Sequence, residues 1–306
     1  MRIGVLGSGF GQAHCDALRA NGHPAEILWS RNLARAEKAA RAHGVPRWTD
    51  RLEDMDGLDL VTIATPHHTH LDLIRRFPLS AIICEKPLHG RRISPEQRVR
   101  PGAPVFVHYS FPFLETARRI EAAVRDGRVG RIYRVVVNVR AWFGTPGDPL
   151  EQYLGVASHE LAWLIHLFGA LEYRHHAWRR DPLSAHASFG NDTVEIDLNL
   201  VQGSRYGIIM DFTFFGSAGE LRCEGGWYGE QGWSFQPVLG DGVALGPAEQ
   251  STGGCIWLRS NTRFFSRAIA VLEGRLAAAT ARAEGVWTLA DAARVEDAYG
   301  PMLQDP

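Results

Sequence analysis

Short apolar runs and amphipathic segments alternate through the first third of the chain. The apolar runs at residues 3–6, 27–29, 58–64, 81–84 and 105–107 predict buried strands. Helices are predicted between them at residues 12–20, 33–43 and 70–77, the first two ending at Asn21-Gly22 and at Gly44. Strands that alternate with helices predict a doubly wound parallel sheet.

The pattern changes after about residue 110. Amphipathic helices are expected at residues 116–125 and 157–168, and two closing helices at 264–276 and 289–299. Strands follow one another at residues 132–139, 194–201, 206–214 and 219–223, and residues 240–254, rich in glycine, are expected to form a surface loop. We therefore predict an α/β domain over residues 1–110 and an α+β domain with an open, largely antiparallel sheet over residues 111–306.

The first predicted strand is followed by a glycine-rich loop of Gly7, Ser8, Gly9, Phe10 and Gly11. Such a loop lets the backbone approach a pyrophosphate, and the N-terminus of the next helix stabilises the negative charge. The third glycine of G-x-G-x-x-G would fall at Gln12, so Gly11 is expected to take over its packing role. The loop predicts a Rossmann dinucleotide site, and a tight turn without a ligand is the alternative.

The end of the second strand indicates which dinucleotide binds. An NAD site usually places Asp or Glu there to hold the ribose 2′-hydroxyl, whereas this strand ends in Trp29-Ser30-Arg31. Arg31, with Arg35 one helical turn later, can pair with a 2′-phosphate. We predict NADP(H) as the preferred cofactor, with NAD(H) as the alternative.

Composition excludes several other classes of protein. The 306 residues carry a formal net charge of -1, which gives no general reason to bind nucleic acid or an anionic membrane. The four cysteines form no CxxC pair and no cluster with zinc spacing, so no metal site is predicted. The chain runs directly into the glycine loop without a signal peptide and has no bilayer-spanning stretch, so the cytoplasm is the expected location.

Three further segments carry a resemblance to a known family. They are Ala64-Thr65-Pro66-His67-His68-Thr69-His70, then Glu85-Lys86-Pro87-Leu88, then Ser158-His159-Glu160-Leu161. Their order and spacing resemble the glucose–fructose oxidoreductase and inositol dehydrogenase (Gfo/Idh/MocA) family over nearly the whole chain. The resemblance implies a Rossmann domain followed by an open mixed sheet, whose face would build a homodimer or homotetramer. A small-molecule substrate would bind to the second domain.

The resemblance also implies a set of site residues. Those expected to lie around the cofactor, besides the glycine loop, are Ala64, Thr65, Pro66, His67, His70, Glu85, Lys86 and Pro87. Lys86 would lie beside the nicotinamide and the reacting carbon, and His159 would face it from the second domain. Hydride transfer at carbon requires a proton to move at the attached heteroatom, and an ammonium can stabilise negative charge there. Arginine is a poor proton donor, which gives a chemical reason for Lys86, since Lys38 is the only other lysine.

The sequence departs from the family pattern where two aspartates are usual, at Gly155 and Ala162. Tyr109 is therefore a further candidate proton donor, and three functions stay open. The leading one is an NADP(H)-dependent oxidoreductase of sugar-like or cyclitol-like hydroxyls and carbonyls. The second is an imine reductase, since thiazolinyl imine reductases resemble this family and share the Phe10-Gly11 pair. The third is a non-catalytic NADP-binding sensor or scaffold.

Overall fold

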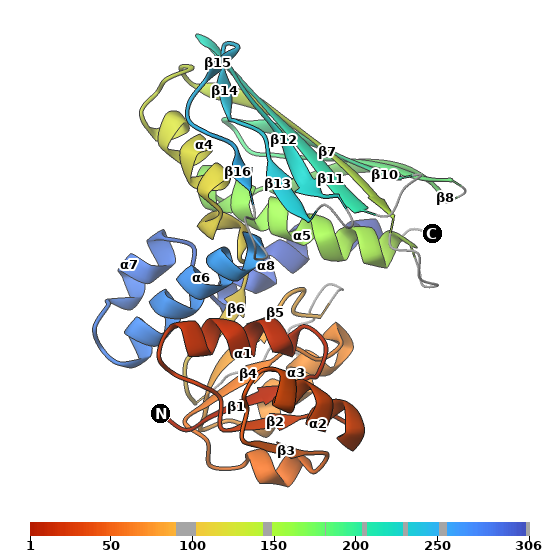
Figure 1. The fold of residues 1–306 in the computed structure, drawn as a ribbon. Helices are drawn as coiled ribbons and strands as arrows, with labels where there is room; N and C mark the ends of the chain where they lie inside the picture. The colour runs from red at the N-terminus through yellow and green to blue at the C-terminus, as the bar shows by residue number, and fades with distance from the viewer. Residues whose placement is uncertain are drawn as a thin grey trace. The chain divides into compact units, whose positions relative to one another are not determined.

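The computed structural model describes residues 1–89, 102–142, 149–180, 182–203, 207–228, 232–250 and 256–303 (Figure 1). It divides into two compact units. The first comprises Met1–Phe113 and Trp257–Asp297, and the second comprises Leu114–Ile256 and Ala298–Pro306. Within the described ranges, no helix combines the length and the apolar character that a bilayer span requires.

The first unit is built on a seven-stranded sheet in the order β17-β6-β5-β4-β1-β2-β3. Its strands are β1 (Ile3–Leu6), β2 (Ile27–Trp29), β3 (Arg47–Thr49), β4 (Leu60–Ile63), β5 (Ala81–Glu85), β6 (Val105–His108) and β17 (Trp287–Thr288). All neighbouring pairs are parallel except β17 with β6. The predicted doubly wound parallel sheet is confirmed, and β3 and β17 are strands that the sequence pattern did not indicate.

Helices connect these parallel strands, and the strand order reverses at β1, which lies between β2 and β4. The connecting helices are α1 (Gly11–Ala20), α2 (Leu33–Ala42) and α3 (His70–Arg76), with 3₁₀ turns at Leu52–Met55 and His67–Thr69. The connection from β1 leads to β2 and that from β4 leads to β5, so the two run in opposite directions along the sheet. Such a switch point is where doubly wound folds bind ligands, at the carboxyl ends of the strands.

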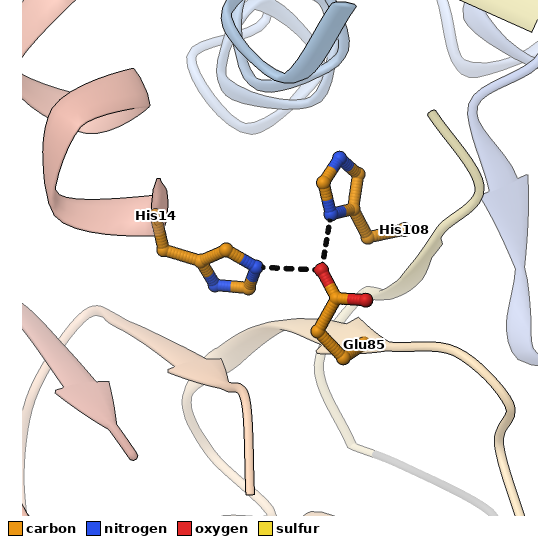
Figure 2. A group of neighbouring side chains, drawn as sticks. All are labelled: His14, Glu85 and His108. Carbon is orange, nitrogen blue, oxygen red and sulfur yellow. Dashed lines mark hydrogen bonds and ion pairs between the residues drawn. The ribbon is translucent and has the colours of Figure 1, made fainter. Parts of the chain in front are cut away.

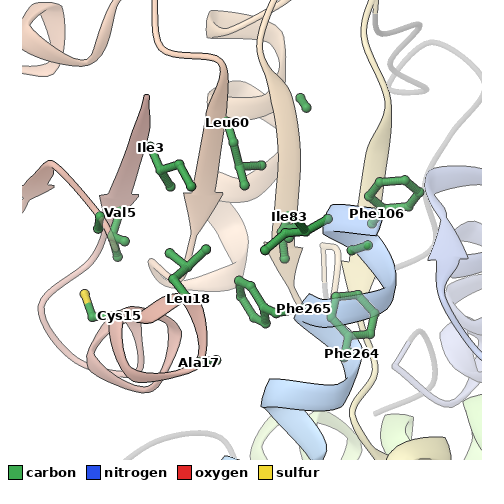
Figure 3. Close-up of a cluster of buried hydrophobic side chains, with 14 of the residues drawn as sticks. Ile3, Val5, Cys15, Ala17, Leu18, Leu60, Ile83, Phe106, Phe264 and Phe265 are labelled. Atoms are coloured by element: carbon green, nitrogen blue, oxygen red, sulfur yellow. The ribbon is translucent and has the colours of Figure 1, made fainter. Parts of the chain in front are cut away.

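The C-terminal segment completes the first unit. It contains α6 (Ile256–Leu272), α7 (Ala278–Ala283) and α8 (Leu289–Tyr299). Phe264 and Phe265 of α6 are wholly buried in one apolar cluster with Ile83 and Phe106 of the parallel sheet (Figure 3). The sequence divided the chain once, after residue 110, and assigned this segment to the second domain. The structure groups residues 257–297 with the first unit, because their apolar side chains cover its sheet.

The second unit contains a ten-stranded sheet, ordered β15-β14-β12-β11-β7-β10-β9-β8, with β13 paired to β12 and β16 paired to β13. Its strands are β7 (Ile132–Trp142), β8 (Glu172–Arg180), β9 (Leu183–Gly190), β10 (Glu195–Gln202), β11 (Gly207–Gly216), β12 (Gly219–Trp227), β13 (Trp233–Phe235), β14 (Leu239–Gly240), β15 (Val243–Ala244) and β16 (Glu249–Gln250). Among the described strands of this second sheet, only β7 and β10 pair in parallel, which confirms an open, largely antiparallel sheet.

The second unit also contains helices α4 (Glu115–Arg125) and α5 (Pro149–Phe168) and a 3₁₀ turn at Gly300–Leu303, whereas the 3₁₀ turn Phe111–Phe113 ends the N-terminal segment of the first unit. Trp163 of α5 is wholly buried, with its ring against Phe212 and Phe214 of β11. The surface loop expected at residues 240–254 was wrong in part: β14 and β15 pair as a hairpin, and β16 pairs with β13. Partner strands, rather than local composition, order that segment.

Candidate cofactor and active site

The glycine loop follows β1 and its glycines have distinct surroundings. Gly7 has φ +115°, and a Cβ there would lie 2.4 Å from the carbonyl oxygen of Ala64. A Cβ on Gly11 would lie 2.9 Å from Val5 Cγ1, so Gly11 occupies the close-packing position expected of it. A Cβ on Gly9 would meet nothing described within 4 Å. Phe10, just before α1, is half exposed. The loop therefore packs tightly on one side and is open on the other.

Gln12 supports this loop from the position of the usual third glycine. Its Nε2 donates to the carbonyl oxygen of Ser8 at 2.7 Å, and its Oε1 lies 2.9 Å from Nε2 of His43. Ser8 Oγ in turn donates to Ser30 Oγ at 3.1 Å, which ties the loop to the end of β2. The sequence showed Gln12 only as the residue at the position of the third glycine and did not indicate its contact with His43, because that contact forms only where α1 meets the end of α2.

The end of β2 leads into a helix start that carries arginines. The side-chain oxygen of Asn32 caps α2 by accepting from the Arg35 amide at 3.0 Å. Arg31 and Arg35 are exposed, and none of the described residues in the first turn of α2 is acidic. Cations near a helix N-terminus add to its positive field instead of offsetting it. This corner is therefore suited to an anion.

The loop after β4 packs over the glycine loop and is tied to the segment after β5. Ala64 lies over Gly7, and Thr65 Oγ1 is 2.7 Å from Thr69 Oγ1. Nε2 of His70 lies 2.8 Å from the Thr65 carbonyl oxygen, and its Nδ1 lies 3.0 Å from that of Pro87. Burial lowers the pKa of His70. The ring of His70, expected at the nicotinamide side of the pocket, thus lies between two loops, with one nitrogen close to a carbonyl oxygen of each.

Two histidines of the same segment, and the proline before them, are nearer the surface. Pro66 and His68 are exposed, and His67 is half-buried with its ring 5.9 Å from that of His68. Their place beside the cofactor stays a prediction.

Glu85, the last residue of β5, points inward to two histidines (Figure 2). Its Oε1 accepts from Nε2 of His14 at 2.8 Å and from Nδ1 of His108 at 2.5 Å. Its Oε2 accepts from the Lys86 amide at 3.3 Å. Burial alone would raise the pKa of Glu85, but the two histidines outweigh it and hold that pKa well below its usual range. Glu85 is therefore a buried carboxylate directly before Lys86. The Glu-Lys-Pro-Leu motif did not indicate that two histidines bind it.

The His14–Glu85–His108 cluster has the composition of a metal site, with ligand atoms within 4.8 Å of one another. Those atoms are already joined by hydrogen bonds. Metal-bound imidazoles usually donate their second N–H to an acceptor. Among the described residues, Nδ1 of His14 and Nε2 of His108 have no such partner. Each histidine donates to Glu85 from its other ring nitrogen, so these two atoms need no acceptor in a hydrogen-bonded cluster. We therefore interpret the three residues as a hydrogen-bonded cluster and not as a metal site.

Tyr109 follows β6 and is wholly buried in the first unit. Its ring lies 5.7 Å from that of Trp287 in an edge-on arrangement. Burial, followed by the charge of Glu296, raises the pKa of its hydroxyl well above the usual value. The hydroxyl therefore stays protonated and lies away from solvent.

His159 lies on α5 in the second unit and is half-buried. The position of Gly155 is open, since a Cβ there would meet nothing described within 4 Å, whereas Ala162 is wholly buried. Nε2 of His166 lies 3.2 Å from Oε1 of Glu121 on α4, and this contact links α5 to α4. Glu151 and Tyr153 are near enough in sequence to compensate for the aspartates absent at Gly155 and Ala162, but their side chains lie outside the described residues.

Comparison with known proteins extends this description. The family model described as "Oxidoreductase family, NAD-binding Rossmann fold" (Gfo/Idh/MocA) matches residues 1–97. An inositol 2-dehydrogenase of Rhizobium meliloti is 32% identical over 165 residues, which are 51% of this chain and 50% of that protein. A D-apiose dehydrogenase of Paraburkholderia graminis is 28% identical over 151 residues, which are 45% of this chain and 40% of that protein. The matches thus span half or less of the length of these curated relatives.

The fold is similar over nearly the whole chain. A 3-ketoreductase of Actinomadura kijaniata, solved with TDP-benzene and NADP, superposes with a TM-score of 0.71 at 20% identity, covering 97% of this chain and 95% of that one. Residues 1–97 thus match the Gfo/Idh/MocA oxidoreductase family model, whose described fold is an NAD-binding Rossmann fold, and the fold of the whole chain is similar to that of the 3-ketoreductase.

Proposed function

We propose that this protein is an NADP(H)-dependent oxidoreductase that transfers a hydride between the nicotinamide and a carbon of a sugar-like or cyclitol-like substrate. One observation carries the proposal: the glycine loop and Lys86 share the carboxyl edge of the parallel sheet. They follow β1 and β5, which flank β4. The loop after β4 bridges them, because Ala64 packs on Gly7 and His70 joins Thr65 to Pro87.

The residues at this edge fit a dinucleotide. The open side of Gly9 and the N-terminus of α1 would hold the pyrophosphate, and Ala64, Thr65 and Pro66 would lie along the nicotinamide half. Arg31 and Arg35 would hold a 2′-phosphate at the start of α2, where Ser30 replaces the usual carboxylate. When bound, the nicotinamide supplies or accepts the hydride. The arginines are our reason for preferring NADP(H) over NAD(H).

Lys86 and His159 are the groups to which we assign the proton. The Lys86 ammonium would hydrogen-bond to the oxygen on the reacting carbon, stabilise negative charge there, and give or take the proton. We assign a supporting role in this proton transfer to His159 on α5, because Gly155 and Ala162 leave that helix without the carboxylates usual in the family. Tyr109 is not part of this proposal, since its hydroxyl is buried.

The substrate class is proposed from the relatives, which are named for inositol and D-apiose. We further propose that the open sheet of the second unit forms a homodimer or homotetramer, as the family resemblance implies. Cys15, Cys84 and Cys223 are buried free thiols, which suits a reducing compartment such as the cytoplasm.

The proposal is tested with the wild type and Lys86→Met. Fluorescence titration should show NADPH binding at least about tenfold tighter than NADH to the wild type, equivalent to about 1.4 kcal/mol. Oxidation of a panel of cyclitols and aldoses with NADP⁺ should show turnover that Lys86→Met lowers by at least about a hundredfold, while NADPH still binds to the variant. Unchanged turnover would remove Lys86 from the chemistry, and equal affinities would remove Arg31 from cofactor selection.

The same screen separates the alternatives. Reduction of a cyclic imine with NADPH, without turnover of any polyol, would favour the imine reductase, whose chemistry has less need of the carboxylates absent at Gly155 and Ala162. Tight NADPH binding without turnover of either class would favour the sensor or scaffold.

A further inference from the structure

The backbone after Lys86 is held by a residue from the far end of the chain. Glu296, on α8, is wholly buried. Its Oε1 accepts from the Leu88 amide at 2.6 Å and from the His89 amide at 3.2 Å. One carboxylate oxygen thus receives two consecutive backbone N–H groups, two and three residues beyond Lys86.

The other polar backbone groups around Lys86 are also held by side chains. The Lys86 amide contacts Glu85, which His14 and His108 keep in place (Figure 2). The Pro87 carbonyl oxygen contacts His70. Side chains from α1, α3, β6 and α8 therefore fix the segment on both sides of Lys86, although 208 residues separate Leu88 from Glu296.

A carboxylate at position 296 requires hydrogen bonds from its surroundings. Hydrogen bonds from amides to an ionised acceptor are about twice as strong as neutral ones. Burying a carboxylate is costly unless such bonds compensate it. An apolar side chain of similar size would fill the space but would leave the buried N–H of Leu88 and the partly buried N–H of His89 without this acceptor. The Glu296 carboxylate therefore does more than fill space: its two hydrogen bonds fix the position of the backbone at residues 88–89.

We propose that Glu296 is a positioning residue that acts through Lys86, fixing the backbone at residues 88–89 so that the Lys86 ammonium meets the reacting centre. The inference rests on the proposed function, because it requires Lys86 to be catalytic. Placement matters for such a group, since a displacement of about 1 Å can cost about a hundredfold in rate.

The test compares Glu296→Leu and Glu296→Gln in the full-length protein. We expect Glu296→Leu to lower kcat at least about tenfold while the Kd for NADPH stays within about threefold, because the cofactor loop is untouched. Glu296→Gln should keep most of kcat, since its carbonyl oxygen can accept from both amides. Should Glu296→Leu fail to fold, Glu296→Asp withdraws the acceptor by one methylene and is expected to lower kcat severalfold.

Asp291→Leu is the matched control for lost stability. Asp291 is a buried carboxylate on the same helix, but it binds Arg282 and Thr288 instead of the Lys86 segment. Its substitution should lower the unfolding temperature and leave kcat, measured well below that temperature, as in the wild type. An equal loss of kcat in both Leu variants would overturn the positioning role.

A double-mutant cycle identifies the route of the effect. Adding Glu296→Leu to Lys86→Met should cause little further loss, because the residue being positioned is already gone. A full additional tenfold loss would overturn the inference while leaving the catalytic role of Lys86 intact. Wild-type kcat in Glu296→Leu would have the same meaning. Wild-type turnover in Lys86→Met alone would overturn the proposed function and the inference together.

Discussion

Gly7 and Gly9 lie two residues apart in one loop, but they are glycines for different reasons. Gly7 has a left-handed backbone and packs directly on the Ala64 carbonyl group, whereas Gly9 has open space where its side chain would be. The first glycine is therefore required by the protein itself. For the second, the described residues give no such reason, and the proposed pyrophosphate would require a close approach to the backbone there.

This difference gives a paired prediction. Gly7→Ala should destabilise the protein by about 1–3 kcal/mol, the range for a strained backbone position, and lower its unfolding temperature. Gly9→Ala should leave the unfolding temperature unchanged but weaken NADPH binding at least about tenfold, because the methyl group lies where the pyrophosphate approaches. Thermal unfolding and fluorescence titration measure the two effects. Wild-type affinity in Gly9→Ala would argue against a pyrophosphate at this loop.

Single residues also mark the limit of sequence reasoning. The glycine loop and Lys86 could be identified because their chemistry is encoded in short motifs. His14, His108 and Glu296 could not, since nothing near them in the sequence indicates that they converge on one segment. A buried polar contact depends on a partner whose position is set by the fold.

Among the elements, helices α1 and α3 each bury a histidine against the parallel sheet. Burial lowers the pKa of His14, on α1, and of His70, on α3, because the charged imidazolium would lose its hydration. Each folded-state pKa is therefore below the unfolded value of about 6.5. These two histidines therefore do not lower the free energy of unfolding above pH 6.5. Below pH 6.5 they lower it, since the unfolded chain takes up these protons before the folded chain does.

We therefore predict that the free energy of unfolding falls between pH 6.5 and pH 5. The slope should be at most about 1.4 kcal/mol per pH unit for each of the two histidines. Urea unfolding at pH 7.5, 6 and 5, followed by circular dichroism, measures it. His14→Gln retains a donor toward Glu85 but removes one titrating group, so its slope should be smaller than that of the wild type. An unchanged slope would show that His14 is protonated in the folded state.

Element limits were predictable only where the local pattern is strong. The helix α8 has the expected bounds, whereas α5 begins at Pro149, eight residues before the predicted start, and β7 continues to Trp142. The amphipathic pattern of α8 is set by its own residues. The length of β7 depends on pairing with β10 and β11, which local patterns do not record.

At the scale of the whole molecule, the first unit is discontinuous in sequence. Residues 257–297 supply β17, the buried phenylalanines of α6 and the Glu296 carboxylate. Where the first segment ends and the second begins, the rings of Phe111 and Trp257 lie 6.4 Å apart. A chain that ended at residue 113 would leave the apolar surface around Ile83 and Phe106 uncovered.

Fragments can test this. Residues 1–113 alone should lack a cooperative thermal transition, because the missing helices leave much of the core exposed to water. Residues 1–113 joined to 257–297 by a short glycine–serine linker should unfold cooperatively and bind NADPH. Circular dichroism melting and fluorescence titration provide the measurements. Cooperative unfolding of the shorter fragment would show that the C-terminal segment is dispensable for this unit.

By itself, the sequence determined the class of the fold, the glycine loop, the arginines after β2 and the lysine after β5, because each depends on residues close together in the chain. The tertiary structure decided that the C-terminal helices belong to the first unit, that His70 joins two loops, and that buried carboxylates hold the backbone around Lys86. These features are contacts between distant segments. Such contacts arise when apolar surfaces are buried together and polar groups must find partners within the interior.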